Sequence, residues 1–339
     1  MSFKLNGTNI LVTGADGFIG SHLCEQLITY GANVKALVFY NSFNKVGWLE
    51  DINPEIVKSM EIISGDVRDS EMVCKLTKNV DIIFHLAALI SIPYSYTSPR
   101  SFVQTNLLGT LNILEGAKAN NCNRIISTST SEVYGSALVT PIDEEHRIQA
   151  QSPYAASKIS ADHILESYVR SYNMPAVVLR PFNTYGPRQS EKAVIANIIR
   201  QAIDDSIKEI KIGTLTTKRD FNYVSDTVMA FIMLALVPDK KISYGSVYNA
   251  GSGHSITIKN ILDIILSMTN SNKNVIVDKK RFRPEKSEVL NLVASSKKIK
   301  KLTGWHNRID MEEGLKKTII WWKKRKEINK LRASSNYSI

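Results

Sequence analysis

A glycine-rich turn near the N-terminus constrains the fold of this chain more than any other feature. The apolar run at residues 9–12 is followed by Thr-Gly-Ala-Asp-Gly-Phe-Ile-Gly at residues 13–20, and a helical pattern continues to Tyr30. At a strand-turn-helix junction, glycines with this spacing let the backbone approach a pyrophosphate and let the helix pack closely on the strand. The turn therefore predicts a dinucleotide site that includes Gly14, Gly17, Phe18, Ile19 and Gly20.

Short apolar runs alternate with longer helical patterns through the first half of the chain. Five further strands are predicted, at residues 34–39, 60–64, 81–85, 124–129 and 176–180. This alternation is typical of α/β proteins whose parallel sheet is covered by helices on both faces. We therefore predict a Rossmann-like, doubly wound parallel sheet within residues 1–185 and a smaller C-terminal α/β lobe, mainly within residues 186–339, that binds the substrate.

This second lobe is expected to be discontinuous. A helix is predicted at residues 191–202 and a strand at 209–212, and the Pro-, Lys- and Ser-rich stretch at 281–287 is assigned to the same lobe. Returning segments are expected within residues 219–251. They are a helical stretch at 222–236 and a short apolar run at 247–250.

The chain is basic, with 43 Lys and Arg against 32 Asp and Glu and a formal net charge of +11. Such a charge suits nucleic acid, an anionic membrane surface, an anionic small substrate or merely a lysine-rich solvated surface. Near the C-terminus the apolar stripe Leu315, Ile319 and Trp322 favours a helix packed on its own domain, with residues 333–339 frayed beyond it. Its basic face would comprise Lys316, Lys317, Lys323, Lys324, Arg325, Lys326, Lys330 and Arg332.

The sequence gives little sign of a membrane, a metal or a disulfide. No apolar run approaches the roughly 20 residues that span a bilayer, and the N-terminus lacks a secretory pattern, so a cytoplasmic location is expected. Cys24, Cys74 and Cys122 are far apart and have no second ligand at metal-binding spacing. We expect no metal site, no membrane partner and no nucleic-acid partner.

Candidate acid-base residues lie in two segments. Tyr154 and Lys158 are one helical turn apart, and the ammonium is expected to lower the pKa of the phenol from about 10, which would make it a base for a substrate hydroxyl. Thr130, Ser131 and Glu132 follow an apolar strand, and the carboxyl ends of parallel strands open into the ligand crevice. A local turn at Thr130 and a surface carboxylate at Glu132 are the alternatives.

The segment that should bind the adenosine ribose leaves the choice of cofactor open. Residues 38–42 read Val-Phe-Tyr-Asn-Ser, without the carboxylate typical of NAD sites and without an arginine for the 2′-phosphate of NADP. Asp66 and Val67, after another predicted strand, are candidates for contact with the adenine. A solvated loop is the competing interpretation of Asp66.

Together these motifs resemble the extended short-chain dehydrogenase/reductase family, and the resemblance covers almost the whole chain. It rests on the glycine turn, His85-Leu86-Ala87-Ala88, Asn106, residues 129–135, Tyr154 with Lys158, residues 181–188 and Arg219-Asp220-Phe221. Within that family the chain is most similar to the NAD-dependent 4,6-dehydratases of legionaminic acid-type sugar biosynthesis. Residues 92–96, 186–190 and 281–284 carry this closer resemblance.

The resemblance implies a nucleotide-sugar substrate, such as UDP- or GDP-N-acetylglucosamine, and NAD as cofactor, with NADP not excluded. Tyr154 and Lys158 would support oxidation at C4 and also contact the cofactor, Thr130 would orient the substrate, and Glu132 would handle the C5 proton. Arginine pairs well with phosphate oxygens, and the nucleotide diphosphate would be held by Asn183, Arg188, Arg219 and Arg283. Leu86, Ala87 and Ala88 would line the cofactor site, and a homodimer would form through helices flanking Tyr154.

One departure keeps other reactions open. Many nucleotide-sugar 4,6-dehydratases carry Asp-Glu after the threonine, whereas this chain has Ser131-Glu132, and a serine hydroxyl is a poor proton donor. Ser-Glu is also found in dehydratases that resemble the GDP-mannose enzyme and in UDP-glucuronate decarboxylases. A 4-epimerase, a decarboxylase and a non-enzymatic nicotinamide sensor are thus the alternatives, although the joint presence of Thr130, Glu132, Tyr154 and Lys158 argues against a sensor.

Overall fold

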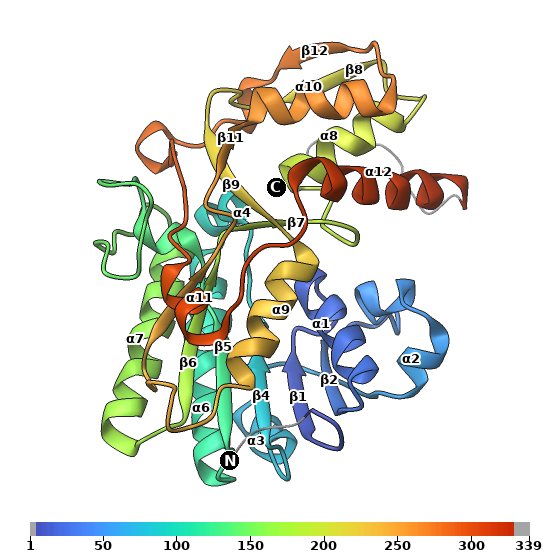
Figure 1. Ribbon diagram of the computed structural model, residues 1–339. Coiled ribbons are helices and arrows are strands. Elements are labelled where there is room, and N and C mark those ends of the chain that lie inside the picture. The colour runs from blue at the N-terminus through green and yellow to red at the C-terminus, as the bar shows by residue number, and fades with distance from the viewer. Residues whose placement is uncertain (1–4, 329–339) are drawn as a thin grey trace.

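The computed structural model describes residues 5–328 and contains a seven-stranded sheet in which every neighbouring pair is parallel. The strand order β10-β6-β5-β4-β1-β2-β3 is that of a doubly wound Rossmann-like fold, so the predicted fold class is confirmed (Figure 1). The strands are β1 (Asn9–Thr13), β2 (Asn33–Phe39), β3 (Glu61–Gly65), β4 (Ile82–His85), β5 (Arg124–Thr128), β6 (Ala176–Pro181) and β10 (Val247–Ala250).

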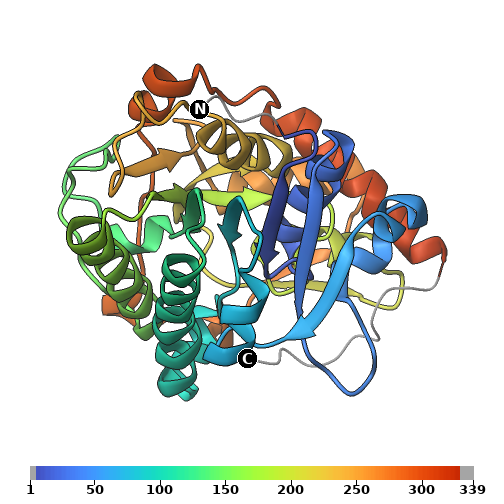
Figure 2. The same ribbon diagram turned by 90° about the horizontal axis from the view of Figure 1, so that it is seen from below.

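Helices cover both faces of this sheet because its strands are apolar on both sides (Figure 2). One face carries α1 (Phe18–Thr29) and α9 (Val224–Ala235), and the other carries α3 (Ser70–Leu76), α6 (Gly109–Ala119) and α7 (Pro153–Tyr172). Within the range predicted to return, α9 packs on β5 and β6, and β10 pairs with β6. The domain division at residue 185 stays a prediction.

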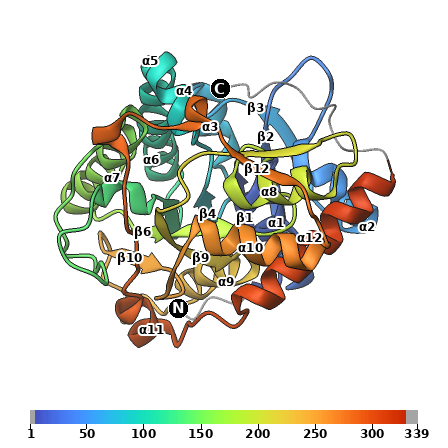
Figure 3. The same ribbon diagram turned by 90° about the horizontal axis from the view of Figure 1, so that it is seen from above.

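The smaller lobe lies over the carboxyl ends of the strands (Figures 1 and 3). A three-stranded sheet joins β7 (Asn183–Tyr185), β9 (Lys218–Tyr223) and β11 (Ser255–Thr257), and a two-stranded sheet joins β8 (Glu209–Ile212) and β12 (Asn274–Val277). Its helices are α8 (Val194–Ile203), α10 (Ile258–Thr269) and α12 (Met311–Glu327).

The remaining elements are short and lie mostly within the loops. They are α2 (Pro54–Lys58), α4 (Ile92–Thr97), α5 (Pro99–Phe102), α11 (Lys297–Thr303), the π-helical η2 (Val103–Leu108) and the 3₁₀ turns η1 (Gly47–Asp51), η3 (Ser131–Tyr134), η4 (Lys279–Arg281) and η5 (Glu285–Ser287). None of the helices within residues 5–328 combines the length and the apolar character that crossing a bilayer requires.

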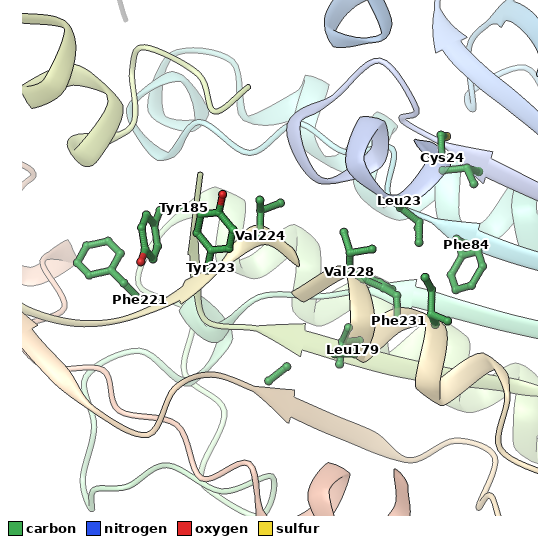
Figure 4. Close-up of a cluster of buried hydrophobic side chains, with 14 of the residues drawn as sticks. Leu23, Cys24, Phe84, Leu179, Tyr185, Phe221, Tyr223, Val224, Val228 and Phe231 are labelled. Atoms are coloured by element: carbon green, nitrogen blue, oxygen red, sulfur yellow. The ribbon is translucent and has the colours of Figure 1, made fainter. Parts of the chain in front are cut away.

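One hydrophobic core connects the two lobes (Figure 4). At the sheet, the ring of Phe84 meets that of Phe231 on α9 edge to face at 6.3 Å. At the other end of α9, Tyr223 meets Tyr185 on β7 at 5.5 Å. Because α9 supplies buried residues at both ends, the small lobe is packed on the Rossmann sheet rather than tethered to it by a linker.

The C-terminal helix docks as the apolar stripe predicts. Leu315, Ile319 and Trp322 on α12 are buried, and Asp310 caps the helix by accepting a hydrogen bond from the Glu313 amide at 2.8 Å. The predicted solvated basic face is wrong in part, since three of its members are engaged with protein groups, the first being Lys317, which pairs with Glu313 at 2.6 Å. Arg325 pairs with Asp51 and stacks on Trp48 and Trp321, and Lys326 binds the Ile203 carbonyl and Asp205. Lys330, Arg332 and residues 333–339 lie outside the described residues.

A buried ion pair ties α7 to β6 beneath the crevice. Arg180 donates to the Asp162 carboxylate at 2.8 Å, and both side chains are less than a tenth exposed. The Ser129 hydroxyl donates to the same carboxylate at 2.7 Å. Asp162 thus joins the end of β5 to the helix that carries Tyr154 and Lys158.

Removal of this carboxylate should destabilise the protein strongly. Asp162→Ala leaves the Arg180 guanidinium buried without its counter-ion, which typically costs about 3–5 kcal/mol in the free energy of unfolding. The exposed pair Lys259–Asp263 on α10 is a matched control, and Asp263→Ala should cost no more than about 0.5 kcal/mol. Chemical denaturation of both variants measures the difference, and equal losses would show that the buried pair contributes nothing special.

Candidate active site

The glycine turn and the loop after β4 meet at the carboxyl edge of the sheet. Gly14 has φ +69°, and a Cβ there would lie 2.8 Å from the Ala87 amide nitrogen. A Cβ on Gly20 would lie 2.1 Å from the Gly14 carbonyl oxygen, whereas one on Gly17 would have a single neighbour, that same oxygen at 3.1 Å. Gly14 and Gly20 are therefore fixed by the packing of the protein itself, whereas a side chain on Gly17, at the start of α1, would be crowded only by that one oxygen.

A buried threonine and histidine hold the loop after β4. The Thr13 hydroxyl accepts from the amides of Leu86 and Ala87, each at 3.1 Å, and lies 2.8 Å from His85 Nδ1. His85 Nε2 lies 3.0 Å from the Thr110 hydroxyl on α6, and burial lowers the pKa of this imidazole to about 3. A neutral His85 thus fixes Leu86, Ala87 and the following Ala88 next to the glycine turn.

A carboxylate does lie at the end of β2, although the strand's own sequence lacks one. Asp16, from the glycine turn, accepts a hydrogen bond from the Phe39 amide at 3.2 Å. Burial raises the pKa of this carboxyl above its usual range. Directly after the neighbouring strand β3, Asp66 binds the Arg68 side chain, which lowers the pKa of the Asp66 carboxyl, and Val67 is buried against Gly109. Asp66 and Val67 therefore lie after β3, near the end of β2, as their order in the sequence suggests.

The predicted acid-base residues come together where β5 meets α7. Tyr154 is the second residue of α7, behind Pro153 and the Ser152 cap, and the Thr130 side chain is hydrogen-bonded to its phenol. Glu132 is close enough to act electrostatically on the same phenol. Tyr154 and Lys158 are both almost fully buried.

The predicted fall in the pKa of Tyr154 is wrong for the protein without bound ligands. Burial raises the pKa of the phenol, Thr130 opposes the rise, and the nearby carboxylates of Glu132 and Asp162 add to it. Burial also lowers the pKa of Lys158, while Asp162 acts in the opposite direction. The sequence argument rested on the helical spacing of Tyr154 and Lys158, but desolvation of the buried phenol is the largest influence on its pKa.

The Thr-Ser-Glu segment caps and begins η3, and its members have different surroundings. Thr130 caps the turn by accepting from the Glu132 amide at 3.3 Å, which was the local alternative for this residue. Ser131 is buried. The Glu132 carboxylate is only 13% exposed and lies 3.6 Å from Arg283 Nη1, so it is not the surface carboxylate of the alternative interpretation.

Two of the predicted phosphate-binding arginines lie at this site. Arg219 on β9 is buried, and its electrostatic neighbours include Glu132, Arg283 and Glu288. Asn183, on the adjacent strand β7, donates to the Asp220 carbonyl at 3.4 Å and thus lies next to Arg219 along the sheet. The structure therefore brings Asn183, Arg219 and Arg283 to the side of Glu132.

Arg188 has different neighbours from the other two arginines. Its guanidinium contacts His22 and donates to the Glu25 carboxylate at 2.5 Å, both on α1. The backbone of Arg188 is left-handed, with φ +65°, which turns the side chain toward that helix. These contacts connect α1 to the segment that follows β7, and the role of Arg188 in binding the diphosphate stays a prediction.

The sequence matches the protein family described as "GDP-mannose 4,6 dehydratase" over residues 11–318. The chain belongs to this family. The suspected membership of the epimerase/dehydratase branch of the extended short-chain dehydrogenases is thereby confirmed.

Within residues 5–328, no cluster of His, Cys, Asp and Glu suited to a metal ion is found.

Relatives of this family member catalyse several reactions. It is 33% identical to a putative UDP-glucose 4-epimerase of Methanocaldococcus jannaschii, covering 93% of this chain and 98% of the relative. It is 31% identical to the dTDP-D-glucose 4,6-dehydratase of Dictyostelium discoideum, covering 93% and 81%. It is 30% identical to the UDP-N-acetyl-alpha-D-glucosaminuronate decarboxylase of Bacillus cytotoxicus, covering 92% and 97%.

Solved structures with the same fold include both epimerases and dehydratases. The UDP-glucose 4-epimerase of Thermotoga maritima, with UDP-glucose, superimposes with a TM-score of 0.84 at 29% identity, covering 94% of this chain and 99% of that one. The dTDP-glucose 4,6-dehydratase of Streptomyces venezuelae, with NAD bound, gives 0.82 at 25% identity, covering 95% and 98%. The family is thus one of nucleotide-sugar enzymes, and identity at this level does not separate dehydratase from epimerase.

Three residues of the site escaped the sequence analysis. Asp16 was counted only as part of the glycine turn, Asp162 carried no motif, and Glu288 lies just beyond the stretch 281–287 that was assigned to the second lobe. Each acts through a partner distant in sequence, namely Phe39, Arg180 and Arg219. The i,i+4 spacing of Asp162 from Lys158 on α7 was the one available signal.

The glycine turn gives a test that separates cofactor binding from folding. Gly17→Val should abolish cofactor retention while the protein still folds, since a Cβ there has only one close neighbour and would project into the space at the start of α1. Gly20→Val should instead prevent folding, because its Cβ would overlap the Gly14 carbonyl. Cofactor per chain after purification and circular dichroism measure the two effects, and unchanged cofactor content in Gly17→Val would contradict the assignment.

Proposed function

We propose that this chain is a nucleotide-sugar 4,6-dehydratase that converts a substrate such as UDP- or GDP-N-acetylglucosamine into its 4-keto-6-deoxy derivative. The observation that carries this proposal is the placement of a second proton acceptor beside the first. Tyr154 with Thr130 can serve the C4 hydroxyl, and the enclosed carboxylate of Glu132 lies next to them at the end of β5. An epimerisation at C4 needs only the first of these groups.

The residues at the carboxyl edge fit NAD. The backbone at Gly17, at the N-terminus of α1, carries no side chain and suits a pyrophosphate, and the loop of Leu86, Ala87 and Ala88 lies beside the glycine turn. When bound there, NAD would accept the hydride from C4 and later return it to C6. Tyr154 and Lys158 would lie on the nicotinamide side of the same edge.

Asp16 favours NAD over NADP in this proposal. Its carboxylate lies at the end of β2, where the ribose of the adenosine would bind, and it can accept hydrogen bonds from the ribose hydroxyls. A 2′-phosphate at that position would meet a negative charge. Arg68, in the turn that follows β3, is already paired with Asp66.

The protein groups would act in sequence. Tyr154 takes the proton of the C4 hydroxyl as C4 is oxidised, with Thr130 holding the oxygen and opposing the rise in the pKa of the phenol. Lys158, one turn further along α7, would support the oxidation from the cofactor side. The resulting ketone acidifies C5, Glu132 removes the C5 proton, and the C6 hydroxyl leaves as water. Glu132, once protonated, is the group placed to supply the proton for that leaving hydroxyl, because Ser131 is a weak acid. The Glu132 carboxylate would then take a proton from solvent and deliver it to C5 as hydride returns to C6, and Tyr154 would release its proton to solvent.

The substrate's diphosphate would be held by the small lobe. Arg219 and Arg283 offer planar donors for its oxygens on one side of Glu132, and Asn183 adds an amide. The homodimer stays a prediction. Its interface would include the exposed side chains of Val103, Leu108 and Tyr172, which lie on and beside the helices flanking Tyr154. The cytoplasmic location likewise stays a prediction.

A 4-epimerase is the second candidate, favoured by the 33% identity to a putative UDP-glucose 4-epimerase. Incubation with UDP-, GDP- and dTDP-sugars, followed by mass spectrometry, separates the reactions. The proposal expects loss of one water from at least one sugar, and NAD rather than NADP released from the denatured protein. Loss of carbon dioxide would identify a decarboxylase. A product of unchanged mass that differs chromatographically would identify an epimerase.

A further inference from the structure

Two ion pairs of alternating charge lie at the diphosphate side of the site. Arg219 Nη2 donates to Glu288 Oε1 at 2.8 Å, and their side chains are 8% and 18% exposed. Arg283 Nη1 lies 3.6 Å from Glu132 Oε1. Electrostatic interactions link all four groups, because Glu132 and Arg283 also affect the pKa of Arg219. Both arginines that would bind the diphosphate therefore face carboxylates of the protein itself.

The segment of residues 283–290, which carries Arg283 and Glu288, is anchored on both sides of the site. On the α7 side, the Ser287 hydroxyl donates to the Gln151 carbonyl at 2.6 Å and is hydrogen-bonded to Tyr96 of α4. On the small-lobe side, the Leu290 carbonyl accepts from the Lys218 amide of β9 at 2.9 Å. Glu288 is thus held beside Arg219 by neighbouring backbone, and its pairing is a built feature of the lobe.

The same segment borders a cavity of about 510 Å³. Arg283, Lys286 and Glu288 line it, together with Ser136, Gln151 and Phe282. Arg283 Nη1 is buried and makes no hydrogen bond among the described residues, since its distance from Glu132 exceeds hydrogen-bonding range. A buried guanidinium nitrogen with a donor to spare, next to a cavity that a second cation, Lys286, also lines, is suited to receive an anion.

We propose that Glu288 is an internal counter-ion of Arg219 that the diphosphate of the substrate displaces on binding. The inference rests on the proposed function, in which Arg219 binds that diphosphate. Glu288 is a positioning residue in this account: it neutralises and orients the guanidinium while the site is free of anions. The presence of Glu288 lowers the affinity of the site, because every diphosphate that binds Arg219 must replace an existing charge-assisted hydrogen bond.

The proposal predicts a gain of affinity from a loss of charge. Glu288→Gln keeps the side-chain shape but removes the competing anion, so inorganic pyrophosphate and the nucleoside diphosphates UDP and GDP should bind about tenfold more tightly, or about 1.4 kcal/mol. Glu288→Asp retains the charge and should remain within about threefold of the wild type. The opposite role, in which Glu288 binds the ribose hydroxyls of the ligand, predicts weaker nucleotide binding and no change for pyrophosphate.

Calorimetric titration of the purified NAD-loaded protein tests this. Glu209→Gln, which removes an exposed carboxylate from β8 in the same lobe, controls for the change in net charge and should leave affinity unchanged. In an Arg219→Met background, Glu288→Gln should alter pyrophosphate affinity by less than about twofold, since the two residues act on the ligand through each other. Thermal melting confirms that each variant is folded.

The outcomes separate this inference from the function on which it rests. Tighter binding of pyrophosphate and of at least one nucleotide by Glu288→Gln, lost in the Arg219→Met background, supports the counter-ion. Unchanged or weaker pyrophosphate binding by Glu288→Gln, with a wild type that does bind pyrophosphate, overturns it while the diphosphate site stands. Absence of binding by the wild type to pyrophosphate, UDP and GDP overturns the diphosphate site and the inference with it.

Discussion

Tyr154→Phe should lower turnover by at least the ~100-fold typical of losing a positioned acid-base group, while the nucleotide sugar still binds. The ring remains in place because phenylalanine keeps the edge-to-face contact with Phe102, 6.2 Å between ring centres. Only the proton acceptor for the C4 hydroxyl and the hydrogen bond with Thr130 are lost. Steady-state kinetics and calorimetric titration of the substrate measure the two quantities separately.

A tyrosine on the same helix provides the control. Tyr172, near the end of α7, is 53% exposed, and Tyr172→Phe keeps its ring beside Lys118. Turnover of this variant should equal that of the wild type. Near-normal turnover of Tyr154→Phe at neutral pH would show that another residue takes the C4 proton.

Glu132→Gln should stop the reaction between its first and second steps. The amide has nearly the shape of the carboxylate but cannot accept the C5 proton, so C4 oxidation proceeds and water loss does not. Absorbance of the reduced cofactor should therefore accumulate to as much as one equivalent per site, and dehydrated product should fall by at least ~100-fold.

The exposed Glu145, in the loop between η3 and α7, gives the matched control, since Glu145→Gln removes the same charge outside the crevice. It should form product at the wild-type rate without accumulating reduced cofactor. Dehydration by Glu132→Gln at the wild-type rate would assign C5 deprotonation to a different group.

Local patterns were enough to predict most of the Rossmann sheet. The runs that became β1, β2 and β8 were placed to within a residue, because each is apolar or alternating and bounded by turn residues. The stripe Leu315, Ile319 and Trp322 predicted the docked α12 because its apolar residues recur at helical spacing. Short strands such as β7 and β11, of three residues each, and the π-helical turn η2 carry too little periodicity to be recognised in advance.

What the sequence could not supply are relations set by tertiary contacts. The spacing of Tyr154 and Lys158 is local and correct, but the pKa of the phenol depends on burial, which the spacing does not reveal. Arg188 follows a family motif, yet a left-handed backbone turns it toward α1. The carboxylate that the sequence of β2 lacks is supplied by Asp16 of the glycine turn. This turn and the end of β2 lie side by side only after folding.

The central claim is that the substrate loses water across C5 and C6 after oxidation at C4, and isotopic labelling tests it most directly. The measurement is the position of deuterium in the product, by mass spectrometry and NMR, from a nucleotide sugar deuterated at C4 and, separately, from unlabelled substrate in D₂O. The account predicts that the C4 label appears at C6 of the same molecule, that solvent deuterium enters at C5, and that the mass falls by one water. A C4 label that returns to C4, with C5 free of solvent deuterium and no change of composition, would contradict it and identify an epimerase.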